Sequence, residues 1–168
     1  GRLTKEIDYV GNITTYAYTG DQRWPSSVTD PKGHTVALIY DVNGNITKVV
    51  DPDNLNPFGA TLEYLYDNKG NVTWMRDAKG VVKTFFYDAS SNVVEIKETL
   101  SETETYSTKL TYDSSGNVTA VQEAAGQSRS FIYDAFGNLL EEKDALGHSS
   151  RRTYDELYRL TGFSADLS

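Results

Sequence analysis

The sequence predicts an all-β fold in which antiparallel β-hairpins of about 21 residues repeat and pair side by side into a curved sheet. Three observations predict it. Two short phrases alternate along the chain, the distances between them are nearly constant, and the segments that separate them alternate in polarity. A fixed period of this length is typical of repeat architectures, in which each unit is stabilised by its neighbours.

The first phrase is Tyr-Asp, two variable residues, Gly-Asn and an aliphatic residue. It is intact four times, as YDVNGNI, YDNKGNV, YDSSGNV and YDAFGNL. Looser copies are YDASSNV and YDELYRL, and the earliest copy is YTGDQRW. The predicted repeat markers are therefore Tyr18, Tyr40, Asp41, Gly44, Asn45, Tyr66, Asp67, Gly70, Asn71, Tyr87, Asp88, Asn92, Tyr112, Asp113, Gly116, Asn117, Tyr133, Asp134, Gly137, Asn138, Tyr154 and Asp155.

The second phrase is an acidic residue followed three positions later by a small or polar residue. Its acidic markers are Asp8, Asp30, Asp51, Asp77, Glu98, Glu123 and Asp144. Five marker tyrosines precede the next acidic marker by 11 positions, and five acidic markers precede the next marker tyrosine by 10. Two longer gaps indicate insertions near a turn, Asn54–Ala60 and Thr99–Thr108, where paired strands tolerate them best.

The segments between the phrases are predicted to be strands, about fourteen in seven hairpins. In NVTWMRD, Val72 and Trp74 share one parity and Thr73 and Met75 share the other, which is the period of a strand. Two columns of mainly apolar residues recur, two positions before and six positions after each marker tyrosine. No stretch shows a helical period with caps.

Each Asp is predicted to begin a tight turn. Its carboxylate can accept backbone N–H groups of the next residues, and the Gly three positions later permits a positive φ. A loop of this size fits a type I turn followed by a left-handed residue.

Composition excludes several classes of protein. The net charge of −8 disfavours nucleic acid as a partner, and no apolar run is long enough to insert in a membrane as a helix. The absence of cysteine excludes disulfides and thiol chemistry. The first residues resemble neither a signal peptide nor a natural start, and the last repeat stops unfinished. We therefore expect residues 1–168 to be a single repeat array of about seven repeats, cut from a longer protein.

The phrase and its phase resemble the RHS/YD-repeat family over almost the whole chain, from about Asp8 to Phe163. That family includes bacterial polymorphic toxins, subunits of insecticidal toxin complexes, wall-associated proteins and teneurins. The resemblance implies a β-sheet strip that spirals into a hollow shell, which in bacterial members encloses a toxic segment. It also implies that this chain is a segment of the shell wall without plug, cargo or protease, because the self-cleaving core region of many bacterial members cannot be placed on it.

No catalytic, cofactor-binding or metal-binding residue is predicted. The carboxylates repeat with the turns, whereas an active site is normally a single constellation. DPDNLN, from Asp51, lacks the Gly and Glu of an EF-hand loop, although weak ion binding by repeated turns stays open. His34 and His148 occupy a position that holds Val81 in another repeat, which favours a place at a strand entry over a catalytic role.

The sequence thus favours a non-enzymatic wall that encloses or displays a toxin or effector polypeptide, secreted or at a bacterial cell surface. Its expected partners are that effector and neighbouring repeats of the parent chain, and its open edges make self-association conceivable. The alternative is a module that binds glycan or protein at a cell surface, for which Trp24, Trp74 and the two insertions are the candidate contacts. Hydrolysis is the third and weakest hypothesis.

Overall fold

The computed structural model describes residues 1–51 and 60–166, with Ala60 and Thr61 as backbone alone. The described residues form fifteen strands and no helix, which confirms the all-β prediction. The strands are β1 (Lys5–Ile7), β2 (Ile13–Ala17), β3 (Ser27–Thr29), β4 (Thr35–Tyr40), β5 (Ile46–Asp51), β6 (Ala60–Tyr66), β7 (Val72–Arg76), β8 (Val82–Tyr87), β9 (Val93–Ser101), β10 (Glu104–Tyr112), β11 (Val118–Gln122), β12 (Ser128–Tyr133), β13 (Leu139–Lys143), β14 (Ser149–Tyr154) and β15 (Leu160–Ala165). The strand beyond the expected fourteen is β1, which precedes the first marker tyrosine.

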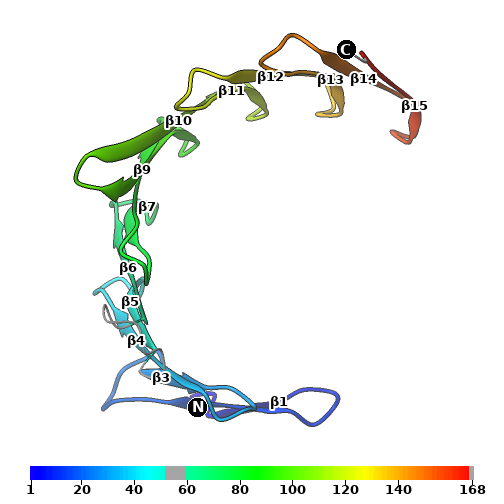
Figure 1. Ribbon diagram of the computed structural model, residues 1–168. Coiled ribbons are helices and arrows are strands. Elements are labelled where there is room, and N and C mark those ends of the chain that lie inside the picture. Colours follow the sequence, from blue (N-terminus) through cyan, green and yellow to red (C-terminus); the bar gives the residue numbers. More distant parts are fainter. Residues whose placement is uncertain (52–59, 167–168) are drawn as a thin grey trace. The chain divides into compact units, whose positions relative to one another are not determined.

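The strands follow one another in the sheet in the order of the sequence, and every pair with a described register is antiparallel. Two compact units are present, Gly1–Thr84 with Thr99–Thr103, and Phe85–Glu98 with Glu104–Ser168. In both units successive turns lie alternately at one end of the strands and at the other (Figure 1). The chain is therefore a meander of hairpins in which each acquires its stability from the hairpins beside it.

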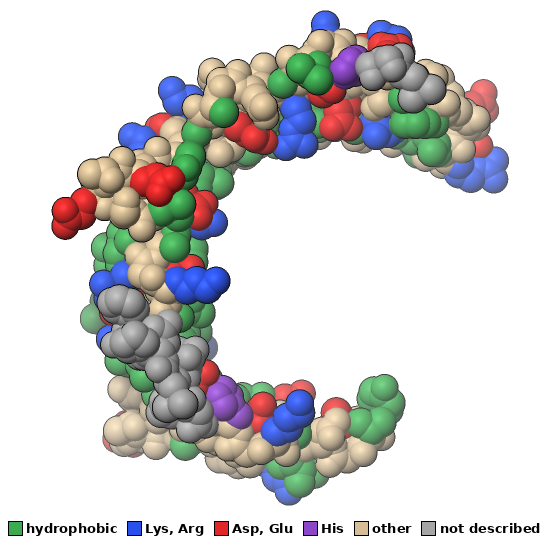
Figure 2. Space-filling model, in the orientation of Figure 1, with side chains coloured by type: hydrophobic (Ala, Val, Ile, Leu, Met, Phe, Trp, Pro, Cys, Tyr) green, Lys and Arg blue, Asp and Glu red, His purple; other side chains and the backbone are tan. Residues whose placement is uncertain are grey.

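In the part of the chain that the structure describes, neither unit has a second layer or a closed core. Within each unit, strands contact only the strands that precede and follow them. Among the described residues, Ser149 alone is buried, with 7% of its surface exposed, and no large side chain is fully buried. Hydrophobic and charged side chains are interspersed along the surface in view (Figure 2). Stability must come from half-buried contacts within the sheet, repeated along the chain.

A β-bulge interrupts the pairing at the end of each described Tyr-Asp hairpin. Tyr66 lies opposite Val72, whereas Tyr64 lies opposite Met75 and Leu65 opposite Trp74. Opposed residues share a face of the sheet, so Val72 and Met75 lie on the face of the tyrosines and Trp74 lies on the other. The parity that groups Val72 with Trp74 is therefore wrong, because the extra residue of the bulge shifts the alternation after Val72.

Threonine occupies the extra position of the bulge in several repeats. The hydroxyl of Thr47 donates to the carbonyl oxygen of Ile39 at 3.3 Å, and that of Thr73 lies 3.4 Å from the carbonyl oxygen of Leu65. These contacts offer the backbone a partner where the strand ladder is interrupted. The threonine that follows the aliphatic residue thus belongs to the repeat, although the sequence phrase did not include it.

The second insertion, Thr99–Thr108, lengthens two strands. Strands β9 and β10 have nine residues each, against three to seven in the other strands. The hydroxyl of Ser107 donates to Glu95 at 2.7 Å in this extension. The first insertion, Asn54–Ala60, lies outside the described residues apart from the backbone of Ala60, as do Asp53 and Asn56 of the DPDNLN segment.

Candidate functional site

The Asp turns are the most regular feature of the chain. The N–H of Asp41 donates to the carbonyl oxygen of Asn45 at 2.9 Å, and the N–H of Gly44 donates to the carbonyl oxygen of Asp41 at 3.2 Å. One carboxylate oxygen of Asp41 accepts the N–H groups of Asn43 and Asn45, both at 2.9 Å. Gly44 has a φ of 92°. This is a type I turn closed by a left-handed residue, as the spacing predicts.

The same turn closes both ends of the repeat. Its backbone bonds recur in the turns that begin at Asp8, Asp30, Asp67, Asp77, Asp88, Asp113, Glu123, Asp134, Asp144 and Asp155. In the Tyr-Asp turns the final Asn also donates its side-chain N–H to the second carboxylate oxygen, at 2.9 Å between Asn71 and Asp67. Arg159 takes the place of this Asn toward Asp155, at 2.7 Å. Each Asp carboxylate therefore organises its own turn, whereas the carboxylate of Glu123 pairs with Arg129.

This bonding keeps the turn carboxylates ionised. The side-chain hydrogen bond from Asn71 lowers the pKa of Asp67 below its ordinary value of 3.8, and backbone N–H groups add to the effect. The pKa is lowered in the same way in Asp8, Asp41, Asp113 and Asp134. Such carboxylates are poor general acids, because they stay deprotonated near neutral pH.

Acid is expected to loosen the turns. Because the pKa values of these carboxylates are lower in the folded chain than the ordinary 3.8, their stabilisation is complete above that pH and is lost as the pH falls through the lowered values. The urea concentration at which half of the chain is unfolded should therefore decrease as the pH is lowered from about 5 to about 2. Asp67→Asn should reduce the slope, and a midpoint independent of pH would contradict this origin.

Four of the marker tyrosines join their hairpin to the one before it. The hydroxyl of Tyr66, at the end of β6, donates to the carbonyl oxygen of Ile46 at the start of β5, at 2.7 Å. The equivalent bonds run from Tyr112 to Val93 at 2.8 Å, from Tyr154 to Leu139 at 3.1 Å and from Tyr18 to Leu3 at 2.8 Å. Each acceptor lies five residues before an acidic marker.

The tyrosines that make these bonds at Tyr66 and Tyr112 are partly buried. Desolvation raises the pKa of Tyr66 and of Tyr112, each with a smaller contribution from a turn carboxylate of the preceding repeat. The phenols therefore remain protonated donors at neutral pH. Tyr18 makes the equivalent bond although its own turn lacks the Asp-x-x-Gly-Asn phrase, so the tyrosine link does not require the turn sequence.

The two tryptophans lie in different settings. The ring of Trp24 stacks on Tyr40, with centroids 5.7 Å apart and planes at 23°, and it covers Gly44 so closely that a Cβ there would lie 2.1 Å from it. A shallow cavity of about 330 Å³ opens beside Trp24 and Tyr40. Trp74 is half-buried on the opposite face, across from Leu65. The structure does not bring the two tryptophans into one site.

A three-strand ion pair lies on the face away from the tyrosines. Glu63 of β6 accepts Lys48 of β5 at 3.2 Å and pairs with Arg76 of β7. Burial alone would raise the pKa of Glu63, but the hydrogen bond from Lys48 and the charge of Arg76 outweigh it and lower the pKa. Glu63 is thus engaged on both sides and is not available for acid–base chemistry.

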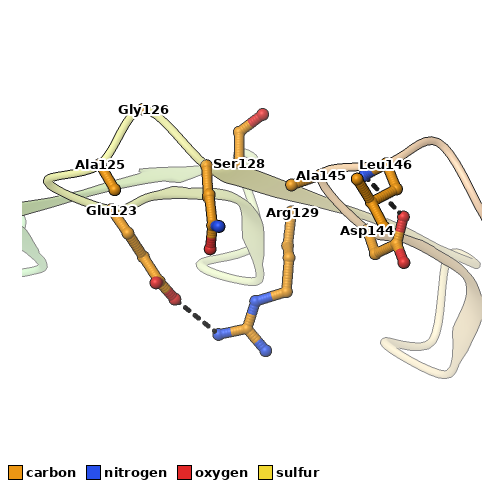
Figure 3. Close-up of a pocket in the computed structure, with 9 residues that line it drawn as sticks. Glu123, Ala125, Gly126, Ser128, Arg129, Asp144, Ala145 and Leu146 are labelled. Atoms are coloured by element: carbon orange, nitrogen blue, oxygen red, sulfur yellow. Dashed lines mark hydrogen bonds and ion pairs between the residues drawn. The ribbon is translucent and has the colours of Figure 1, made fainter.

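A cavity of about 480 Å³ lies between the turns that begin at Glu123 and Asp144 (Figure 3). Its Glu123 pairs with Arg129 at 3.4 Å, as the dashed line in the figure marks. Asp144 accepts the backbone N–H of Leu146 and a ring nitrogen of His148, both at 2.9 Å. Both carboxylates are held by neighbours, so this cavity offers no unengaged acid–base pair.

Each histidine binds the carboxylate of an acidic marker. His148 replaces the turn Asn toward Asp144, and Nε2 of His34 lies 2.9 Å from Asp51. In the described part of the chain, no three His, Cys, Asp or Glu side chains gather as metal ligands would. Nor does that part contain a helix long and apolar enough to cross a membrane.

The comparisons with known proteins agree with this architecture. The teneurin YD-shell family matches residues 55–154, and the RHS repeat family matches residues 1–35 and 24–55. No curated protein matches the chain.

A solved structure shows the same fold. A chain of the Photorhabdus luminescens Tc holotoxin pore superposes with a TM-score of 0.73 at 16% identity, over 92% of this chain and 9% of that one. A chain of the TcdB2–TccC3 complex matches 92% of this chain and 11% of its own length, at 18% identity and a TM-score of 0.45. This chain thus spans about a tenth of the proteins it resembles. With repeat phrase, hairpin order and family match in agreement, the chain belongs to the teneurin YD-shell family.

Proposed function

We propose that this chain is a stretch of the wall of a hollow YD-repeat shell that encloses or displays a toxin or effector polypeptide, and that it has no catalytic role. The observation that carries the proposal is the single layer of strands with half-buried side chains on both faces. Such a layer is suited to separating two spaces, because neither face is committed to a folded core of its own.

The arrangement of the polar groups supports this role. The Asp carboxylates of the turns, the Glu63 network and four of the marker tyrosines bind groups of the sheet itself. Side chains that hold the wall together are unavailable for turnover. Lys, Glu and Thr on the strands would leave a wet surface, which can hold an unfolded polypeptide by exclusion and weak polar contacts.

The proposal places the chain in a larger assembly. Residues 1–168 would form one array within a longer polypeptide, whose neighbouring repeats pair with the open edges of β1 and β15. Pairing between copies is the competing use of the same edges. The shell would be secreted or displayed at a bacterial cell surface, where it meets its target.

Protease protection tests the enclosure. The chain is expressed together with the polypeptide that flanks it in its reading frame, and cleavage of the flanking effector segment is followed over time. An enclosed segment should resist cleavage until denaturant opens the shell, whereas the same segment expressed alone should be cut at once. Equal cleavage rates in the two forms would contradict enclosure.

The alternative, a glycan- or protein-binding surface module, depends on aromatic rings with an open face. Trp24 has one ring face against Tyr40, so Trp74 is the sharper test of the two. Binding to a glycan array that is lost in Trp74→Ala and retained in Trp24→Ala would favour this alternative over the wall.

A further inference from the structure

The last two Tyr-Asp turns differ from the others at their tips. The third residue of the turn is Phe136 in one and Leu157 in the other, and both are largely exposed. The same position holds Asn43, Lys69, Ser90 and Ser115 in the earlier turns. An exposed Phe is not needed to build this turn, since four other turns form without one.

The fourth position of the last turn is also unusual. Tyr158 has a φ of 60° at a place where most of the turns have Gly, and a side chain with a Cβ is disfavoured in that conformation. Its ring packs on that of Phe136 with centroids 4.9 Å apart. The two turns therefore present a pair of exposed rings, with 73% of Phe136 and 51% of Tyr158 accessible.

Phe136 and Tyr158 line a cavity of about 380 Å³ between the two turns. Three aromatic residues line it, Phe136, Tyr154 and Tyr158, together with the acidic residues Asp134, Asp155 and Glu156. The carboxylates of Asp134 and Asp155 also bind within their own turns. Leu140 completes the lining, and none of these described residues is basic. The nearest cation of the turn, Arg159, is paired with Asp155 at 2.7 Å.

Aromatic faces and carboxylates together are the recognition chemistry of organic cations, which are attracted by the ring quadrupole and by the negative charge. Other aromatic rings of the chain already bind cations of the chain itself. Arg2 lies 5.2 Å from the centroid of Tyr18, Lys97 lies 5.0 Å from that of Phe86, and Arg152 lies 5.6 Å from that of Phe163.

We propose that the cavity between these two turns, which we name the Phe136–Tyr158 groove, binds an organic cation from outside the chain. An ammonium or guanidinium group would lie against the rings of Phe136 and Tyr158 and face Glu156. The volume is within the range of small-molecule sites, so a free quaternary ammonium compound or the end of a Lys or Arg side chain would fit. The site does not depend on what the shell encloses.

Choline is the first probe, and its uncharged isostere 3,3-dimethylbutan-1-ol is the matched control. In an NMR titration of the whole chain, choline should shift the ring signals of Phe136 and Tyr158 to saturation. The isostere should bind about tenfold more weakly, because it has the shape without the charge. A third titration, with N-acetyl-lysine amide, distinguishes a free quaternary ammonium compound from a protein side chain as the ligand. Tighter binding of this compound than of choline would indicate that the groove binds a Lys or Arg side chain.

The variants are taken from the chain itself. Phe136→Ser and Tyr158→Gly install the residues that the turn at Asp113 has at the same positions, Ser115 and Gly116, so the fold should be kept. The equivalent groove of about 540 Å³ between the turns at Asp88 and Asp113 has the ring of Tyr112 alone and is an internal control. The double variant should lose choline binding and remain folded. Unchanged affinity in that variant, or equal binding of choline and the isostere, would overturn the proposal.

Discussion

Gly44→Ala should destabilise the first unit by about 3 kcal/mol, more than the same substitution in any turn whose Gly has open space around it. Two causes add. Gly44 has a φ of 92°, which disfavours a Cβ, and the new methyl group would lie 2.1 Å from the ring of Trp24. The ring must move, and its stacking on Tyr40 is lost with it.

Gly70→Ala is the matched control, because Gly70 has a φ of 85° and no atom beyond its two neighbours in the chain lies within 4 Å of the place that the new methyl group would take. It should cost about 1–2 kcal/mol, from the backbone conformation alone. Urea unfolding followed by the fluorescence of Trp24, in a Trp74→Phe background, reports on the affected repeat. In a Trp24→Ala background the two glycine substitutions should cost the same. A Gly44→Ala effect no larger than that of Gly70→Ala would contradict the steric origin.

The spacing of short phrases was enough to predict the hairpins, because the turn is a local structure. Asp, Gly and Asn bind within five consecutive residues, so the determinants of each turn are contiguous in the sequence. It was harder to predict which side chains lie on which face of the sheet in the strand that follows a turn. One extra residue at the bulge puts Val72 and Met75 on one face and Trp74 on the other, and period-two counting cannot see that shift.

The long-range contacts could not be read from spacing alone. The Tyr66 hydroxyl reaches a carbonyl 20 residues earlier and the Tyr154 hydroxyl one 15 residues earlier, since insertions change the separation. The acceptor is constant when it is counted from the acidic marker, which is a signal that the sequence does contain. For Trp24 no such signal exists, because its position over Gly44 depends on the path of an irregular loop. The Phe136–Tyr158 groove was missed for the opposite reason, because the two residues that distinguish it from the other grooves, Phe136 and Tyr158, depart from the repeat.

Tyr66→Ala should cost about 2–3 kcal/mol and should uncouple β6 from the hairpin before it. The half-buried ring lies opposite Val72 and 6.4 Å from the ring of Tyr64, and its hydroxyl binds the carbonyl oxygen of Ile46. Removing the side chain beyond Cβ abolishes these contacts together. Because each hairpin is stabilised by its neighbours, the loss should be felt in β5 as well as in β6.

Tyr66→Phe separates the two contributions, because it keeps the ring and removes the hydroxyl alone. It should cost about 1 kcal/mol, the net value of one hydrogen bond to a carbonyl oxygen. Hydrogen exchange of the β5 amides locates the effect. Exchange should accelerate slightly in Tyr66→Phe and strongly in Tyr66→Ala, while the amides of β14 and β15 keep their protection. If Tyr66→Phe were as damaging as Tyr66→Ala, the hydroxyl would be the main link between hairpins and ring packing a minor one. If both variants left β5 unchanged, the marker tyrosine would stabilise its own hairpin and not the joint between repeats.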